Sequence, residues 1–293
     1  MRGAAWRELD LVTGARRRGR HRMYGIVAVV LVLLVAGGLA SRGWGERPAS
    51  PADGDRPLYL ALGDSLATGV GASDPAERGY VTLVHEDLRG KLECGRGTGS
   101  GCPDLGLVNL GVSGATTTTL LRDQVPEALE MLRARNRDGD SSNDVEVISV
   151  DIGGNDAFGV YPVCSGGVTP ACIEAVRTMF ASVSRNLATA LSELREAAGP
   201  DTRIVVMTYY NALIGCDRSA AAPIAGVLLE GGVGVPAGLN DVIRSRATEV
   251  GAAVAETYGQ LGAGDLVGGD DCLHPVDSGY RIIADAFAAA LAS

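Results

Sequence analysis

Residues 58–66 read LYLALGDSL, an apolar run that ends in a glycine and two polar residues. A short run in which polar and apolar side chains do not alternate is typical of a strand buried on both faces of a parallel sheet. Gly63 and Asp64 favour a tight turn after this strand. Ser65 would then stand at the carboxyl end of the strand, which is where ligands bind to open α/β sheets.

Apolar runs and helical periodicity alternate through the rest of the chain, and this alternation predicts a parallel sheet with helices on both faces. We expect strands at 58–62, 107–110, 145–150, 203–209 and 252–256. We expect helices at 79–92, 120–135, 173–198, 239–250 and 278–291. The predicted fold class is α/β: a three-layer α/β/α sandwich with a central parallel sheet in flavodoxin-like strand order.

Two further polar motifs follow predicted strands. Gly114 belongs to the pair SG at 113–114, after the second strand, and Asn155 belongs to the motif GGND at 153–156, after the third. The carboxyl ends of parallel strands meet at one edge of a sheet, so we expect Ser65, Gly114 and Asn155 to face one cleft.

A serine hydroxyl becomes a useful nucleophile only when a base removes its proton. Of the three histidines, His21 lies in an arginine cluster and His85 lies within a predicted helix, whereas His274 lies in a loop just before the last helix. Asp271 precedes His274 by three residues, so its carboxylate can reach the imidazole and fix its tautomer. Asp270 is adjacent and stays an alternative.

The same motifs contain donors for an oxyanion. A tetrahedral intermediate needs hydrogen bonds aimed at its oxygen. The backbone N–H groups of Ser65 and Gly114 and the side-chain amide of Asn155 are the candidates. We assign no catalytic role to Asp156, which could help to fix its loop. No Cys or His cluster has zinc spacing, so we expect neither a metal nor a cofactor.

Taken together, the four blocks GDSL (63–66), SG (113–114), GGND (153–156) and DCLH (271–274) resemble the SGNH (GDSL) hydrolase family over residues 58–293. The resemblance implies the same α/β/α fold and a serine carboxylic ester hydrolase, of esterase or lipase type, that works through an acyl-enzyme. Family substrates include lipids, acylated sugars, thioesters and short esters. Some members orient the histidine partly through backbone carbonyls, so the part played by Asp271 stays open.

Two other functions remain alternatives. The first is a cell-envelope carbohydrate O-acetyl esterase or acyltransferase, although Trp6 and Trp44 both lie outside the predicted domain, which leaves no tryptophan to stack on a sugar. The second is a non-catalytic membrane-anchored binding module, against which the intact Ser65, Asn155 and His274 argue. We expect the segments 161–172 and 221–238 to wall an apolar pocket, as acyl-binding sites are mostly apolar.

The N-terminal part of the chain predicts export. Residues 1–22 carry a net charge of +5 and precede an uncharged apolar segment at 23–41, which is near the minimum length for a membrane span. The basic flank would stay in the cytoplasm. A signal-anchor and a cleaved signal peptide both fit, because the sequence GLA at 38–40 offers a cleavage site. Residues 42–57, rich in Pro, Gly and charge, look like a linker to the domain at 58–293.

Cysteine number and charge agree with an extracytoplasmic protein. The six cysteines all follow the apolar segment, and outside the cytoplasm an even number indicates disulfides. Short loops favour the pairs Cys94–Cys102 and Cys164–Cys172, which leaves Cys216–Cys272. The chain carries −9 overall, so its body is acidic and we expect no nucleic-acid partner. We expect a monomer that acts on a small-molecule or lipid ester.

Overall fold

The computed structural model describes residues 56–91, 102, 104–164, 167–215, 222–232, 235–269, 271 and 273–292. Its sheet contains five parallel strands in the order β2-β1-β3-β4-β5. Their bounds are β1 Leu58–Gly63, β2 Gly106–Asn109, β3 Val145–Asp151, β4 Arg203–Met207 and β5 Ala253–Ala255. This is the predicted flavodoxin-like order, and each predicted strand is present.

The central strands form because their side chains are apolar on both faces. All six residues of β1 are buried, and so are Ile204 to Met207 of β4. β1 and β3 pair in parallel up to Gly63 opposite Asp151, so both strands end at the same level. The segments that follow them therefore start side by side at one edge of the sheet.

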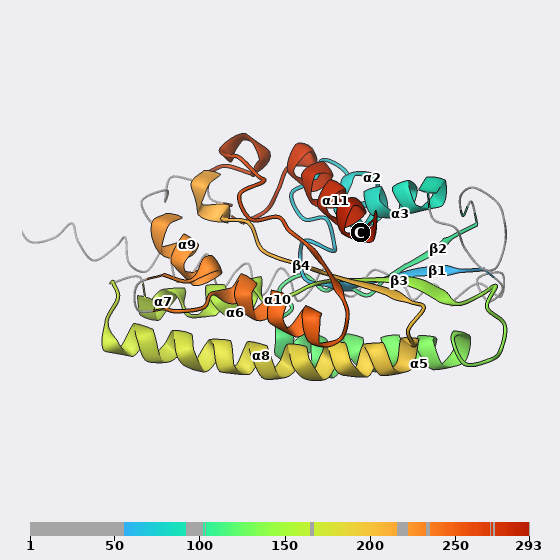
Figure 1. Cartoon of the computed structure of the whole chain (residues 1–293). Helices are drawn as coiled ribbons and strands as arrows, with labels where there is room; N and C mark the ends of the chain where they lie inside the picture. Colours follow the sequence, from blue (N-terminus) through green and yellow to red (C-terminus); the bar gives the residue numbers. More distant parts are fainter. Residues whose placement is uncertain are drawn as a thin grey trace, which may run out of the picture. The chain divides into compact units, whose positions relative to one another are not determined.

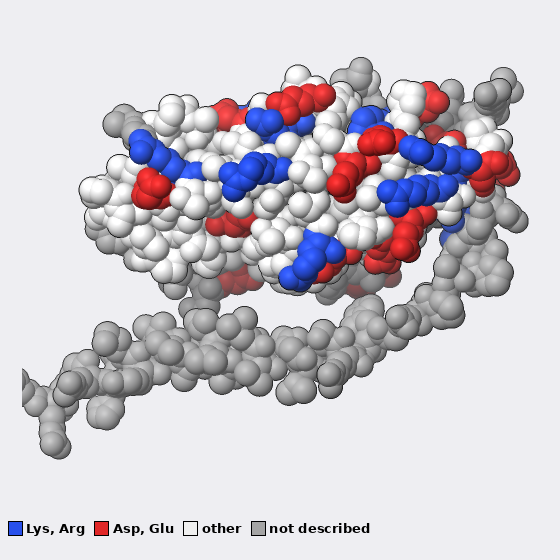
Figure 2. All heavy atoms as spheres, turned by 90° about the horizontal axis from the view of Figure 1, so that it is seen from below, with Lys and Arg blue, Asp and Glu red and all other residues white. Residues whose placement is uncertain are grey.

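Helices cover both faces of this sheet, which gives the predicted three layers (Figure 1). One face carries α5 (Val125–Arg135), α8 (Pro170–Ala198) and α10 (Leu239–Glu249). The other carries α2 (Pro75–Arg78), α3 (Tyr80–Lys91) and α11 (Asp277–Ala292). The α8 face bears acidic and basic side chains interspersed with one another (Figure 2).

The predicted helix at 120–135 is divided into three pieces. A short α4 (Thr117–Thr119) leads into a π-helical turn η2 (Leu120–Gln124), and α5 follows. Pro126 follows directly after this turn, as the second residue of α5. Gln124 is the last residue of the π-helical turn.

Five short helices were not predicted: α2, α4, α6 (Gly154–Gly159), α7 (Tyr161–Cys164) and α9 (Ala222–Glu230). Glycines, prolines or a very short length hide the helical period in these segments. The 3₁₀ turns η3 (Ala212–Gly215) and η5 (Ala263–Asp265) complete the connections. The elements α6, α7 and α9 lie together at one end of the molecule in Figure 1.

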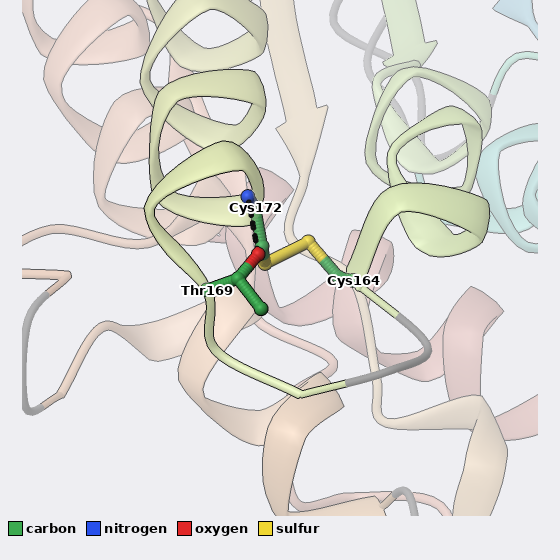
Figure 3. The surroundings of a disulfide bond; sticks show 3 residues. All are labelled: Cys164, Thr169 and Cys172. Atoms are coloured by element: carbon green, nitrogen blue, oxygen red, sulfur yellow. Dashed lines mark hydrogen bonds between the residues drawn. A yellow bond between two sulfur atoms is a disulfide. The ribbon is translucent and has the colours of Figure 1, made fainter.

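The structure joins Cys164, at the end of α7, to Cys172, in the first turn of α8 (Figure 3). Thr169 caps α8 beside this bond, because its Oγ1 accepts a hydrogen bond from the Cys172 N–H at 3.2 Å. This is one of the predicted pairs. Cys102 is also disulfide-bonded. Cys94, Cys216 and Cys272 lie outside the described residues, so the other two pairings stay predictions.

The predicted membrane segment at 23–41, its basic flank and the linker at 42–57 fall before the first described residue, apart from residues 56 and 57. Among the described helices, none has the length and apolar character that crossing a bilayer requires. All described residues belong to one compact unit, Ala52–Ser293.

Candidate active site

Ser65 lies in a tight turn directly after β1. The Asp64 carboxylate accepts the Leu66 N–H at 2.9 Å, and the Val70 N–H donates to the Ser65 carbonyl at 3.0 Å. Ahead of the turn, the Gln124 side chain accepts the Gly63 N–H at 2.9 Å and donates to the Gly63 carbonyl at 2.8 Å. The end of the strand and the serine turn are therefore both held by hydrogen bonds.

The structure brings Ser65, His274 and Asp271 into one hydrogen-bonded line. His274 Nε2 is 2.9 Å from Ser65 Oγ, and His274 Nδ1 is 2.8 Å from Asp271 Oδ2 and 3.1 Å from Asp271 Oδ1. Ser65 and His274 are 209 positions apart, and the fold alone brings them together. A base in contact with a hydroxyl and oriented by a carboxylate is the arrangement that activates a serine.

The loop that carries His274 is itself fixed. Asp271 Oδ1 accepts the N–H groups of Leu273 at 2.9 Å and His274 at 3.2 Å. The Tyr210 hydroxyl, just past β4, donates to the Leu273 carbonyl at 2.6 Å. Partial burial alone would raise the pKa of Asp271, but the hydrogen bonds from the Leu273 N–H and from His274 outweigh it and lower that pKa below its usual value. The carboxylate beside the imidazole therefore stays ionised at neutral pH.

We expect Tyr210→Phe to lower kcat roughly fivefold for a short ester and to leave KM unchanged. The substitution removes one hydrogen bond, about 1 kcal/mol, from the loop that orients His274. Steady-state kinetics measure the effect. Tyr59→Phe is the matched control, because the Tyr59 hydroxyl bonds to Ser149 Oγ inside the sheet and not to that loop. An equal loss in both variants would contradict the prediction.

Asn155 lies in the first turn of α6, which follows β3. Gly153 adopts a φ of 119°, which favours glycine, and a Cβ on Gly154 would lie 2.5 Å from the Tyr209 ring. Both glycines are thus needed for this entry into the helix. Asn155 Nδ2 donates to the Ala115 carbonyl at 2.9 Å and lies 3.4 Å from Asp64 Oδ2.

The loops after β2 and β3 are also joined. Asp156 accepts hydrogen bonds from the Thr117 N–H and from the Thr117 hydroxyl, each at 2.8 Å. These bonds fix the loop, which is the role that the sequence analysis suggested for Asp156. Gly114 lies in the first of these loops with a φ of 82°. Gly114 does not line the cavity at Ser65, whereas Asn155 does.

A cavity of about 180 Å³ opens beside Ser65, Asn155 and His274. Its walls are mostly apolar, and they come from α6 and α7, from α9 and from the segment after β4. The side chains from α6 and α7 are Ala157, Phe158, Tyr161 and Cys164, and those from α9 are Ile224, Ala225, Leu228 and Leu229. Both segments predicted to wall a pocket thus contribute to it. The bond from Cys164 to Cys172 fixes one wall to α8.

The sequence did not reveal the polar groups beneath the serine turn. Asp64, Gln124 and Asp151 are each at most 3% exposed. Tyr80 and Tyr209 donate hydrogen bonds to Asp151 at 2.5 Å and to Asp64 at 2.7 Å. The one available signal was an aspartate directly after the β-branched run 145–150. Within the described ranges, no group of His, Cys, Asp or Glu side chains could hold a metal ion.

Comparison with solved structures shows the same fold. A lipase, Lip_vut3, from a goat rumen metagenome has a TM-score of 0.53 and 20% identity, over 80% of this chain and 97% of that one. Phospholipase A1 from Streptomyces albidoflavus NA297 has a TM-score of 0.50 and 23% identity, over 80% and 99%. Axe2, an acetylxylan esterase from Geobacillus stearothermophilus, has a TM-score of 0.52 and 19% identity, over 82% and 96%.

No curated protein matches the chain. The model of the GDSL-like Lipase/Acylhydrolase family, in contrast, matches residues 61–282, which begin within β1 and end within α11. This range contains all four sequence blocks, the cavity and each of the strand ends described above. The chain therefore belongs to the GDSL-like lipase/acylhydrolase family, whose members hydrolyse esters.

Proposed function

We propose that the protein hydrolyses carboxylic esters through an acyl-enzyme formed on Ser65. The observation that carries this proposal is the unbroken contact from Ser65 Oγ through His274 to Asp271 at the mouth of an apolar cavity. His274 takes the Ser65 proton as the hydroxyl attacks the ester carbonyl, and then gives it to the departing alcohol. Water, deprotonated by the same imidazole, releases the acid. Asp271 holds the tautomer and stabilises the imidazolium.

The oxyanion of each tetrahedral intermediate would be held by the Ser65 N–H, the Gly114 N–H and the Asn155 amide. One Asn155 N–H is engaged by the Ala115 carbonyl at 2.9 Å. The other has only a long contact of 3.4 Å, to Asp64 Oδ2, and is the one that can turn to the oxyanion. A small shift of the loop at 113–115 would bring Gly114 into the same hole.

The cavity supports an ester with an apolar acyl chain. Its walls carry the side chains of Phe158, Leu228 and Leu229, and Phe158 and Ile224 are 44% and 41% exposed. Apolar surface of this kind is favourable only when a substrate removes it from water. An acetyl group would leave most of the cavity unfilled, so we place a longer acyl ester ahead of an O-acetyl sugar.

Hydrolysis of p-nitrophenyl esters from acetate to palmitate tests both the acyl-enzyme mechanism on Ser65 and the preference for a longer acyl chain. We expect turnover that rises beyond acetate, and a fluorophosphonate probe that labels Ser65 and no other residue. Ser65→Ala should lose turnover and label, whereas Ser113→Ala, an exposed serine of the neighbouring motif, should keep both. Label on a different residue would contradict the mechanism, and activity confined to acetate would favour the O-acetyl esterase.

We also propose that the domain works outside the cytoplasm. The bond between Cys164 and Cys172 supports this, because disulfides persist in oxidising compartments. The uncharged segment at 23–41 would serve either as an anchor or as a cleaved signal. The size of the mature chain and its accessibility to protease added to intact cells distinguish the two, and a full-length chain protected inside the cell would refute export.

A further inference from the structure

Two buried carboxyl groups face each other beneath the serine turn. Asp64 lies between β1 and Ser65, and Asp151 is the last residue of β3, with Gly63 as its neighbour across the sheet. They are 2% and 0% exposed. The Asp64 N–H donates to Asp151 Oδ2 at 3.2 Å, so the two carboxyl groups lie close enough for a hydrogen bond between them. A Cβ on Gly63 would lie 2.0 Å from Asp151 Oδ1, so glycine is required there.

A hydrogen bond between two carboxyl groups requires a proton on one of them. The ion pairs of the described residues involve neither Asp64 nor Asp151, so no Lys or Arg neutralises the pair. Two ionised carboxylates in contact in the interior repel each other strongly, and such pairs retain one proton. Burial raises the pKa of both groups, and that of Asp151 well above its usual value.

The surrounding donors indicate which of the two is ionised. Asp64 accepts the Leu66 N–H at 2.9 Å and the Tyr209 hydroxyl at 2.7 Å, and Asn155 Nδ2 lies 3.4 Å away. Asp151 receives only the Tyr80 hydroxyl and the Asp64 N–H. Donors stabilise a carboxylate, so the charge belongs on Asp64. The other titratable groups that face the pair are Tyr59, Tyr210, Tyr280 and His274.

We propose that Asp151 is protonated at neutral pH and donates a hydrogen bond to Asp64, and that the Asp64 carboxylate is a positioning residue for Ser65 and Asn155. The second half of this proposal rests on the function proposed above for those two residues. The carboxylate joins the Ser65 turn to Tyr209, whose ring packs against Gly154 in the first turn of α6. Through this ring it sets the distance between the serine and Asn155, and the connection remains when the Asn155 N–H leaves Asp64 for the oxyanion.

Asparagine at position 64 and asparagine at position 151 are expected to have different effects, which separates the roles of the two aspartates. In Asp64→Asn an amide NH₂ replaces one acceptor oxygen and meets the donors of Tyr209 or Leu66. We expect kcat to fall about 10- to 100-fold with KM unchanged, as one or two charge-assisted hydrogen bonds are lost. Asp151→Asn has the shape of the protonated acid: its amide oxygen can accept from Tyr80 and its NH₂ can donate to the Asp64 carboxylate, and only the 3.2 Å bond from the Asp64 N–H is lost. We expect its kcat to stay within about threefold.

Infrared spectroscopy detects the proton without reference to activity. The full-length protein at pH 7 should show the carbonyl band of a buried, protonated carboxylic acid, and Asp151→Asn should lack it. Absence of the band in the unsubstituted protein, or its persistence in Asp151→Asn, would overturn the assignment of the proton. If the band is present and Ser65→Ala is nevertheless fully active, the proposed function is refuted, but the assignment of the proton to Asp151 stands.

Three kinetic outcomes decide the positioning role. A lower kcat in Asp64→Asn alone supports it. An equal loss in both variants, or a lower melting temperature of Asp64→Asn with unchanged kcat, would show that the pair is only structural. If Asp64→Asn does not fold, Tyr209→Phe removes a single donor to the same carboxylate. It should lower kcat by about fivefold, and unchanged kcat there would overturn the role of Asp64.

Discussion

Replacing His274 with alanine is expected to lower kcat for ester hydrolysis by about 10⁶-fold, as loss of the base does in other serine hydrolases. His274 Nε2, 2.9 Å from Ser65 Oγ, is the one imidazole in contact with that hydroxyl, so nothing else in the described site can take its proton. Single-turnover kinetics with p-nitrophenyl butyrate measure the loss. Added imidazole should restore part of the rate, because removal of the side chain leaves space beside the serine.

His85→Ala is the control for this experiment. His85 belongs to α3, and its Nε2 contacts the Leu105 carbonyl at 2.8 Å, far along the sheet from the catalytic edge. Burial lowers the pKa of His85, so it is neutral at pH 7 and its loss removes no charge. We expect its kcat to match that of the unsubstituted enzyme. A folded His274→Ala protein that kept a substantial part of its activity would refute the base assignment.

Asp271→Asn is expected to lower kcat by about 10⁴-fold, the cost of the wrong histidine tautomer. The asparagine can still accept the Leu273 N–H, so the loop should keep its shape. Its NH₂ group, however, would face His274 Nδ1 as a second donor and so favour the tautomer that cannot accept the Ser65 proton. Measurement of kcat and of circular dichroism on the same sample separates this chemical loss from unfolding.

Asp270→Asn serves as the control, and it tests the alternative that the sequence left open. We expect it to retain the activity of the unsubstituted enzyme, since the Asp271 carboxylate already contacts both the imidazole and the loop backbone. A loss of less than tenfold in Asp271→Asn would instead mean that backbone groups orient His274.

The strands and the triad could be predicted because their signals are local. The runs at 58–62 and 145–150, the first apolar and the second β-branched, are short and bounded by turn residues. Their ends, and with them Ser65 and Asn155, were therefore placed to within one residue or two. His274 and Asp271 lie three positions apart in one loop. His274 was chosen as the base because His21 lies in an arginine cluster and His85 within a predicted helix, whereas the parallel sheet, whose strand ends meet at one edge, placed Ser65 beside Asn155.

The features of the site that the sequence did not predict depend on contacts between segments that are far apart in the chain. Nothing in the residues around Asp64 and Asp151 shows that the two side chains meet, because this needs the register of β1 against β3. Gln124 was hidden inside a region predicted as ordinary helix, and only the π-helical turn directs it at Gly63. The helix α9 was missed because it is short and contains Pro223 and Gly226, two residues typical of turns and loops.

The π-helical turn η2 limits which insertions and deletions the sequence can tolerate. Gln124 is fixed to the backbone of Gly63 by two hydrogen bonds, and it reaches that strand end only because η2 contains one residue more than an α-helical turn. Deletion of any single residue from 120–123 would restore the α-helix and rotate Gln124 by about 100°. Insertions and deletions in this segment, although it lies outside every catalytic motif, should therefore be excluded in evolution as strictly as changes in the serine turn itself.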